Sequence, residues 1–258
     1  MRSKVTTWVA RQAIKRAPRR RYEPAPPLPD DVQAPHHLVI IPDGNRRWAE
    51  GNGVPKVQGH RKGAEVVDSI VWQCRDWGVR ILTLWGFSTE NWERPSDEVR
   101  YLMDLISEFM ERIEADLHEN EVSFRHLGRK DRLPRELLEI IARAEESTRD
   151  YDQYSLNLCL DYGGRDEVVR AVQKMLDAGV APHDVTETKL AQYLDTAGIP
   201  DPDLIIRTSG EMRLSGILPW QSVYTELAFI EEHLPDLTPD ILKRVFEDYS
   251  SRQRRFGK

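Results

Sequence analysis

The first cluster of side chains that could bind a charged group follows an apolar run at residues 37–41. The run is typical of a buried parallel strand and ends in a Pro-Asp-Gly-Asn turn that leaves the Asp43 carboxylate free. Arg46 and Arg47 then fall in the first turn of an expected helix, where the helix dipole disfavours cations. A docked anion would resolve this conflict, and Asp43 could hold a metal ion against it. The segment therefore predicts a diphosphate–metal site, although an ordinary strand–turn–helix corner with solvated arginines fits it equally well.

A second group of cations lies far along the chain. Arg207 and Arg213 bracket a Ser-Gly turn, and Ser215 follows. Two guanidinium groups and a hydroxyl around a glycine turn suit a diphosphate, and surface salt bridges are the alternative. His60 adds a donor among the cations and glycines of 56–63, although a lone histidine is more often structural than catalytic.

Strand and helix patterns alternate from residue 36 onward and would position these side chains. Strand patterns lie at 37–41, 80–87, 121–127, 155–161, 203–207 and 226–230. Apolar residues at helical spacing mark 64–77, 98–118, 135–147 and 165–178, and Thr238-Pro239 opens a last helix. We expect one α/β domain over 36–258, with a mostly parallel central sheet flanked by helices.

The polar clusters follow the predicted strands, and in parallel sheets ligands bind at the carboxyl ends of strands. Asp43 and the segments 88–94, 161–165 and 207–213 would therefore meet at one edge. The apolar helices at 64–77 and 98–118 would pack as core by default. If they part, they line an apolar tunnel, which beside anion sites would suit a lipid diphosphate.

Composition excludes several other classes of protein. The chain has 258 residues and a formal net charge of −6, and no apolar run approaches the roughly 20 residues of a membrane span. It has no Gly-x-x-x-x-Gly-Lys-Ser/Thr loop, no Gly-x-Ser-x-Gly elbow and no zinc-type spacing. Cys74 and Cys159 both lie in apolar stretches, which favours buried thiols in a reducing compartment.

The first 35 residues differ from the rest and form the predicted N-terminal extension. Residues 1–22 carry eight cations and no acid, with Trp8, Val9 and Ile14 among them. This head could be a surface helix on anionic lipid or a solvated tail. Residues 23–35 are rich in proline and predict an extended linker.

Together these segments closely resemble the cis-prenyltransferases, the undecaprenyl diphosphate synthase family. The resemblance spans 36–258 and follows the order of that family's motifs. The matching motifs are Asp43-Gly44-Asn45-x-Arg47-Trp48-Ala49, Gly59-His60-x-x-Gly63, Phe87-Ser88-Thr89-Glu90-Asn91-Trp92-x-Arg94-Pro95, Tyr162-Gly163-Gly164-Arg165, Asp203-Leu204-Ile205-Ile206-Arg207-Thr208-Ser209-Gly210-Glu211, Arg213-Leu214-Ser215, Trp220-Gln221, Glu226-Leu227 and Arg254-Arg255-Phe256-Gly257.

The resemblance implies two substrate sites and a magnesium ion. Residues implied to hold an allylic diphosphate such as farnesyl diphosphate are Gly44, Asn45, Arg46, Arg47, Trp48, Lys56, His60, Trp92 and Arg94. Residues implied to hold isopentenyl diphosphate are Arg207, Arg213 and Ser215, with Arg255 and Gly257 from the partner of a homodimer. Asp43 and Glu226 would serve Mg²⁺, and Asn91 belongs to the motif linked with proton removal.

The implied activity is condensation of isopentenyl diphosphate onto an allylic diphosphate, giving a Z-polyprenyl diphosphate. The alternatives are a non-catalytic partner subunit and an irregular prenyl-coupling enzyme. The first lacks the Asp43 position and the second loses the Asn-Trp-Arg stretch, and both are present here. We expect a cytoplasmic protein, with peripheral contact to the inner face of the membrane through 1–22 and no nucleic-acid partner.

Three departures from the commonest bacterial pattern bear on this expectation. Arg46 replaces a glycine and would add charge at the allylic diphosphate. Lys56 stands where an arginine is frequent, so it keeps the charge but loses the guanidinium fork. Gly86 lies near a position linked to tunnel width, and its small size favours a longer product.

Overall fold

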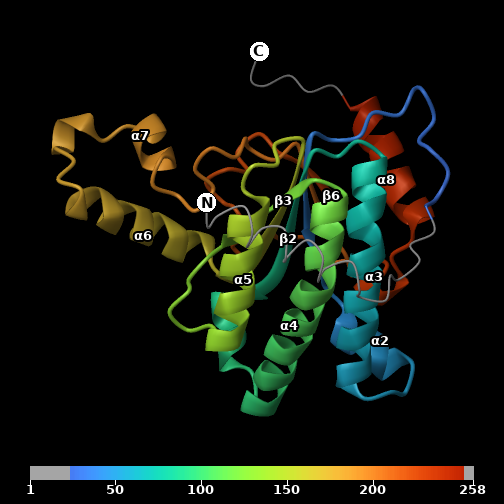
Figure 1. The fold of residues 1–258 in the computed structure, drawn as a ribbon. Helices are drawn as coiled ribbons and strands as arrows, with labels where there is room; N and C mark the ends of the chain where they lie inside the picture. The colour runs from blue at the N-terminus through green and yellow to red at the C-terminus, as the bar shows by residue number, and fades with distance from the viewer. Residues whose placement is uncertain (1–23, 253–258) are drawn as a thin grey trace, which may run out of the picture.

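A six-stranded parallel sheet forms the centre of the protein (Figure 1). The computed structural model describes residues 24–252. The strands are β1 (His37–Ile41), β2 (Ile81–Ser88), β3 (Val122–Leu127), β4 (Tyr154–Tyr162), β5 (Leu204–Arg207) and β6 (Glu226–Phe229), in the order β3-β4-β2-β1-β5-β6. Every pairing is parallel. All five residues of β1 are buried, because it lies inside the sheet with both faces covered.

Helices connect the strands, as the alternating pattern predicts. They are α2 (Asn45–Gly51), α3 (Lys56–Asp76), α4 (Ser96–Glu119), α5 (Arg135–Thr148), α6 (Gly164–Asp177), α7 (Glu187–Ala191) and α8 (Pro239–Ser251). The α3 helix begins at Lys56 and not at residue 64, because Gly59 and Gly63 interrupt the apolar spacing of its first turns without breaking the helix. In the described part of the chain, no helix is both long and apolar enough to cross a membrane.

The two faces of the sheet are covered unequally. Helices α3, α4, α5 and α8 lie over one face and bury the larger core with alternate residues of the strands (Figure 1). The other face carries a smaller core that includes Ile217 and Leu218 from an irregular segment. The α6–α7 hairpin projects from this side with an apolar cluster of its own (Figure 1).

Residues 24–35 have an extended course but also pack against the domain. The Ala25 N–H donates to Gln73 Oε1 at 2.8 Å, and the Trp77 indole donates to the Pro26 carbonyl at 3.0 Å. Leu28 and Val32 pack on the larger core. These contacts go beyond a linker that only spaces two regions apart. The basic head predicted at 1–22 lies outside the described residues.

Candidate active site

The site begins where β1 and β5 end side by side. Ile41 is paired with Arg207, so the turn after β1 brings Asp43 onto the Arg207 guanidinium, with 2.9 Å between Nη2 and Oδ2. Arg47 reaches the other oxygen of Asp43 from one helical turn away, at 3.3 Å. The Asp43 backbone is fixed by Thr208, whose hydroxyl accepts from its N–H and donates to its carbonyl, each at 2.7 Å. The two cation clusters predicted from sequence therefore meet at one carboxylate.

Asp43 is held in its ionised form by these neighbours. Burial raises the pKa of its carboxyl, but hydrogen bonds from Arg207 and the Gly44 N–H outweigh burial and bring the pKa below its usual value. The side chain remains 30% exposed toward a cavity, whereas that of Arg207 is only 6% exposed. Asp43 is thus an accessible anion within a cationic site.

Glycines allow α2 to sit directly on α3. Gly44 has φ of +96°, and a Cβ there would lie 2.4 Å from Ser209 Oγ. On α3, a Cβ at Gly63 would lie 2.3 Å from Asn45 Oδ1, and Gly59 faces the Asn45 carbonyl just as closely. The Gly-His-x-x-Gly motif therefore lets α2 approach, which brings Arg46 and His60 to one side of the cavity.

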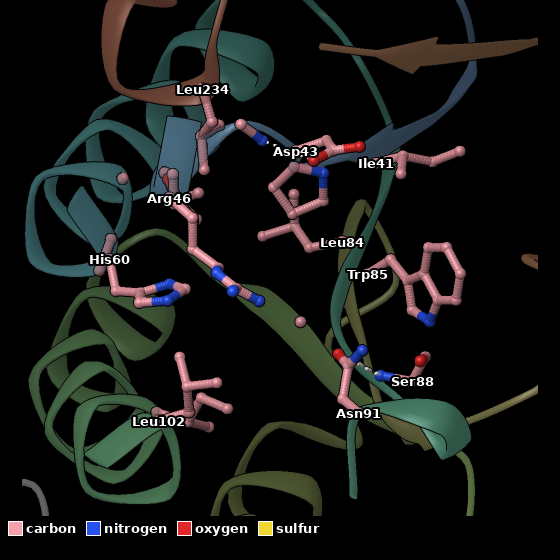
Figure 2. Close-up of a pocket in the computed structure, with 18 of the residues that line it drawn as sticks. Ile41, Asp43, Arg46, His60, Leu84, Trp85, Ser88, Asn91, Leu102 and Leu234 are labelled. Atoms are coloured by element: carbon pink, nitrogen blue, oxygen red, sulfur yellow. Dashed lines mark hydrogen bonds between the residues drawn. The ribbon is translucent and has the colours of Figure 1, made fainter. Parts of the chain in front are cut away.

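Arg46 extends into the cavity beside the His60 ring, which comes from α3 (Figure 2). Arg94 lines the same side from the turn just before α4. Burial lowers the pKa of His60 and of Arg94, and the charge of Arg46 lowers both further. Glu98 opposes these effects from α4, because Oε1 lies 3.2 Å from Arg94 Nη1 and 3.5 Å from His60 Nε2.

The cavity continues from this polar mouth into an apolar body, with a volume of about 680 Å³. Its apolar lining residues recur at helical spacing on α3 and α4 and come also from β2 and β4: Ala64, Val67, Leu84, Leu102, Leu105, Ile106, Phe109 and Leu158. The predicted apolar tunnel is present, but only the first half of α3 lines it. Ile70 and Cys74, further along, are buried in the core.

The Ser-Thr-Glu-Asn-Trp segment closes one side of the cavity after β2. Asn91 lines the cavity and accepts from the Ser88 N–H at 3.1 Å. Trp92 turns away from the cavity and donates to Asp161 Oδ1 at 2.9 Å, where it also packs edge-on against Phe87. Trp92 therefore supports this segment from behind and does not line the cavity, and its contact with the allylic substrate stays a prediction.

Arg207 and Ser215 line the cavity on the β5 side and are joined by a hydrogen bond of 2.8 Å. Arg213 is more exposed and pairs with Glu211, while its carbonyl accepts from Arg207. The segment carrying Ser215 is tied to α6, since the Gly164 N–H donates to the Gly216 carbonyl at 2.8 Å.

Buried polar residues also hold the segment that carries Ser215 against α6. Glu167 on α6 accepts from the Tyr162 hydroxyl at 2.6 Å and from the Gln221 amide at 3.1 Å. Burial raises the pKa of Glu167, whereas these two hydrogen bonds lower it. The Tyr-Gly-Gly-Arg and Trp-Gln motifs, to which the sequence assigned no chemistry, thus fix the Ser215 segment against α6.

Comparison with known proteins identifies the family. Residues 41–257 match the Prenyltransf family, described as undecaprenyl diphosphate synthase. The chain belongs to this family. It is 43% identical to the isoprenyl transferase of Aquifex aeolicus, with 88% of this chain and 97% of that protein covered. It is 45% identical to the isoprenyl transferase of Thermotoga maritima, with 88% and 98% covered.

Two solved structures share the fold. A lavandulyl diphosphate synthase from Lavandula x intermedia, in complex with dimethylallyl diphosphate, superposes with a TM-score of 0.84 at 33% identity, covering 87% of this chain and 99% of that one. A probable undecaprenyl diphosphate synthase from Campylobacter jejuni gives 0.74 at 31% identity, covering 88% and 100%. The expected family and the expected α/β fold are confirmed.

Within this undecaprenyl diphosphate synthase fold, some predicted residues lie away from the cavity. Trp48 donates to Asp236 at 2.8 Å, and Lys56 is exposed and pairs with Glu50 at 3.9 Å. Arg255 and Gly257 lie outside the described residues. The roles predicted for all four residues in substrate binding stay predictions.

Glu226 does not reach Asp43 within one chain. It lies at the amino end of β6, paired in register with Leu204, and its carboxylate binds Arg252 at 2.9 Å. Asp43 lies beyond the carboxyl end of β1, at the opposite edge of the sheet. Within residues 24–252, no group of three or more acidic, histidine or cysteine side chains is arranged to hold a metal. A metal shared by both residues requires Glu226 of a second copy.

Sequence reasoning missed two acidic residues of the site, Glu98 and Glu211. Glu98 joins Arg94 to His60, and Glu211 joins Arg47 to Arg213, with 3.1 Å to Arg47. Glu98 stands four residues after Arg94, a helical ion-pair spacing that could have revealed it. No local signal marks Glu211 as a partner of Arg47, because the two are brought together only by the β1–β5 pairing.

Proposed function

We propose that this protein is a cis-prenyltransferase that condenses isopentenyl diphosphate onto an allylic diphosphate and releases a Z-polyprenyl diphosphate. One observation carries this proposal: a cationic mouth opens directly into an apolar cavity of about 680 Å³. A diphosphate with a long hydrocarbon tail matches both parts. The family relation and the names of its members support the same activity.

The arginines supply charge where the reaction needs it. Breaking the allylic C–O bond leaves the electron pair on the diphosphate, whose negative charge increases. Arg46, Arg94 and His60 lie at the mouth, where their N–H donors would stabilise that leaving group. The resulting carbocation is attacked by the double bond of isopentenyl diphosphate held near Arg207 and Ser215. The attack forms the new C–C bond and moves the positive charge to the isopentenyl unit. An adjacent C–H then loses its proton to a diphosphate oxygen and leaves the new double bond, and Asn91 lines the cavity where this would take place.

Asp43 fits a magnesium ion as a carboxylate that one copy of the chain supplies at the cavity. It is ionised, 30% exposed and faces the cavity, and Mg²⁺ is commonly bound by one or two carboxylates together with substrate phosphates. When bound, the ion would neutralise charge on the diphosphate. Arg207 and Arg47 hold the carboxylate in place for it.

The homodimer proposal gains support from exposed apolar side chains on edge strand β6 and in the segment between β5 and β6. They are Met212, Val223, Tyr224 and Leu227, which are 78%, 71%, 65% and 36% exposed. Arg252 donates to the Leu227 carbonyl at 3.1 Å. A second copy that packs on these side chains would have its own Glu226 at the interface, because Glu226 directly precedes Leu227.

A direct test uses purified protein, labelled isopentenyl diphosphate, Mg²⁺ and allylic primers of several lengths. Mass spectrometry should show a primer extended by whole five-carbon units. Absence of any extended product would refute the proposed activity and would favour the alternative, a non-catalytic partner subunit. A product joined head-to-middle from two allylic units would instead favour the irregular coupling enzyme.

The dimer has a separate test. Light scattering should give twice the mass of 29.9 kDa, and Tyr224→Lys should shift the protein toward monomer. Deletion of 254–258 should raise the KM for isopentenyl diphosphate while the dimer persists. A fully active monomer would contradict the proposal.

A further inference from the structure

We infer that Glu98 is a positioning residue, which holds His60 and Arg94 in the geometry that receives the allylic diphosphate. This inference rests on the proposed function and goes beyond it, because Glu98 belongs to none of the motifs assigned to the reaction. Its carboxylate does not line the cavity, whereas both of its partners do. It therefore acts through them and not on the substrate.

The contacts of Glu98 converge on a single oxygen. Oε1 lies 3.2 Å from Arg94 Nη1, two residues before its own helix, and 3.5 Å from His60 Nε2 on α3. The side chain is only 14% exposed, so solvent screens these interactions weakly. One largely buried carboxylate thus contacts two cavity-lining groups, one from α3 and one from the turn before α4.

The charges around Glu98 show why such a tie is needed. Arg46, Arg94 and His60 all face the mouth, and within residues 24–252 Arg46 takes part in no hydrogen bond or ion pair. Without an anion the Arg46 and Arg94 guanidinium groups repel one another, and both disfavour a proton on His60. Glu98 places a fixed negative charge next to Arg94 and His60, so the mouth stays assembled before a diphosphate arrives.

The geometry also leaves His60 ready to bind. Its ring is buried, with 6% of the residue exposed, and within the described residues Nε2 makes no hydrogen bond. At 3.5 Å, Glu98 orients this nitrogen electrostatically without occupying it by a hydrogen bond. A diphosphate oxygen in the cavity would meet a donor that has already been placed.

Glu98 also has a structural role as an acid in the first turn of α4, where it favours the helix dipole. Asp97 shares that turn and is exposed, so Asp97→Asn removes the same type of charge without touching His60 or Arg94. It serves as the matched control for Glu98→Gln.

The test measures farnesyl diphosphate binding by calorimetry without isopentenyl diphosphate, and steady-state KM for each substrate. Glu98→Gln should weaken farnesyl diphosphate binding and raise its KM by about tenfold, the loss expected for a charge-assisted contact. The KM for isopentenyl diphosphate should change less than about twofold, and Asp97→Asn should match wild type.

A double-mutant cycle completes the test. With Arg94→Ala already present, Glu98→Gln should cost less than it does alone, because the partner has gone. Equal effects of Glu98→Gln and Asp97→Asn, or additive effects with Arg94→Ala, would overturn the inference. Failure of wild-type protein to bind farnesyl diphosphate at all would instead refute the proposed function.

Discussion

Asp43 is the residue on which the whole site converges. Its position could be predicted from sequence, because a strand followed by Pro-Asp-Gly-Asn puts one carboxylate at a sheet edge. Its partner Arg207 could be predicted only as a member of a second cation cluster. The contact between them depends on β5 pairing with β1 in one register, which no local pattern specifies.

Replacing Asp43 should therefore remove catalysis. Asp43→Ala should lower kcat by about a hundredfold or more, since charge stabilisation worth several kcal/mol is lost from the leaving group. Arg207 would also lose its carboxylate while remaining buried, so the melting temperature should fall as well. Asp43→Asn keeps the shape and should show the same loss of kcat with a smaller change in melting temperature. Near-normal turnover with an unchanged magnesium requirement would remove Asp43 from the site.

At the scale of elements, the order of the strands and of the longer helices could be predicted, whereas the short helix α7 and the contact between α2 and α3 could not. Periodicity indicated helix only from residue 64, because glycines carry no apolar side chain to show the spacing. Gly59 and Gly63 leave the space in which Asn45 of α2 approaches α3. This is a contact between two helices, so the spacing within either helix does not reveal it. The unequal cover of the two sheet faces also depends on tertiary packing and left no signal in the sequence.

A methyl group at Gly63 should displace α2. The added Cβ would lie 2.3 Å from Asn45 Oδ1 and 3.0 Å from Leu234, so the Asn45 side chain must move, either alone or with the helix that carries Arg46 and Arg47. Gly63→Ala should raise the allylic KM by about tenfold or more, since displacements near 1 Å can cost that much. Gly51→Ala is the matched control, because nothing lies within 4 Å of its Cβ. It should leave kinetics unchanged, and equal kinetics for both variants would show that α2 tolerates the methyl group.

At the scale of the whole molecule, buried histidines make the fold sensitive to acid. Burial lowers the pKa of His37 to about 4, and it also lowers those of His60 and His126. His37 bridges the Pro200 carbonyl and the Thr83 hydroxyl at 2.7 and 2.9 Å. Between an unfolded pKa near 6.5 and a folded pKa of about 4, the unfolded chain binds more protons.

The free energy of unfolding should thus fall as the pH drops through this window. His37 alone should contribute about 1.4 kcal/mol per pH unit below about 6.5. Denaturant unfolding of wild type and His37→Gln at pH 7, 6 and 5 isolates the contribution of His37. The free energy of unfolding should depend less steeply on pH in the variant. His183→Gln is the control, since this side chain is 83% exposed. Parallel slopes for wild type and His37→Gln would show that His37 does not contribute to acid sensitivity.

The N-terminal extension has two parts with different expected roles. Composition predicted a basic head and a proline-rich linker, but it did not indicate that the linker packs. Residues 24–35 bind α3 through Gln73 and Trp77, and Gln33 donates to Ser250 Oγ on α8 at 2.5 Å. Removing the head alone and removing the head with this segment should therefore give different results.

We expect residues 24–258 to keep the stability and activity of the full chain but to lose co-sedimentation with anionic liposomes, because each cation of the head adds about 1 kcal/mol of attraction at low salt. Residues 36–258 should also lose the burial of Leu28 and Val32, lowering the free energy of unfolding by about 1–3 kcal/mol. Activity on soluble primers with detergent should stay near normal below the lowered melting temperature, since 24–35 does not line the cavity. High salt should release the full chain from the liposomes, which is the control for an electrostatic attachment.

Equal liposome binding by all three proteins would show that the head is not the anchor. Loss of activity in 24–258 would place the head in the catalytic fold.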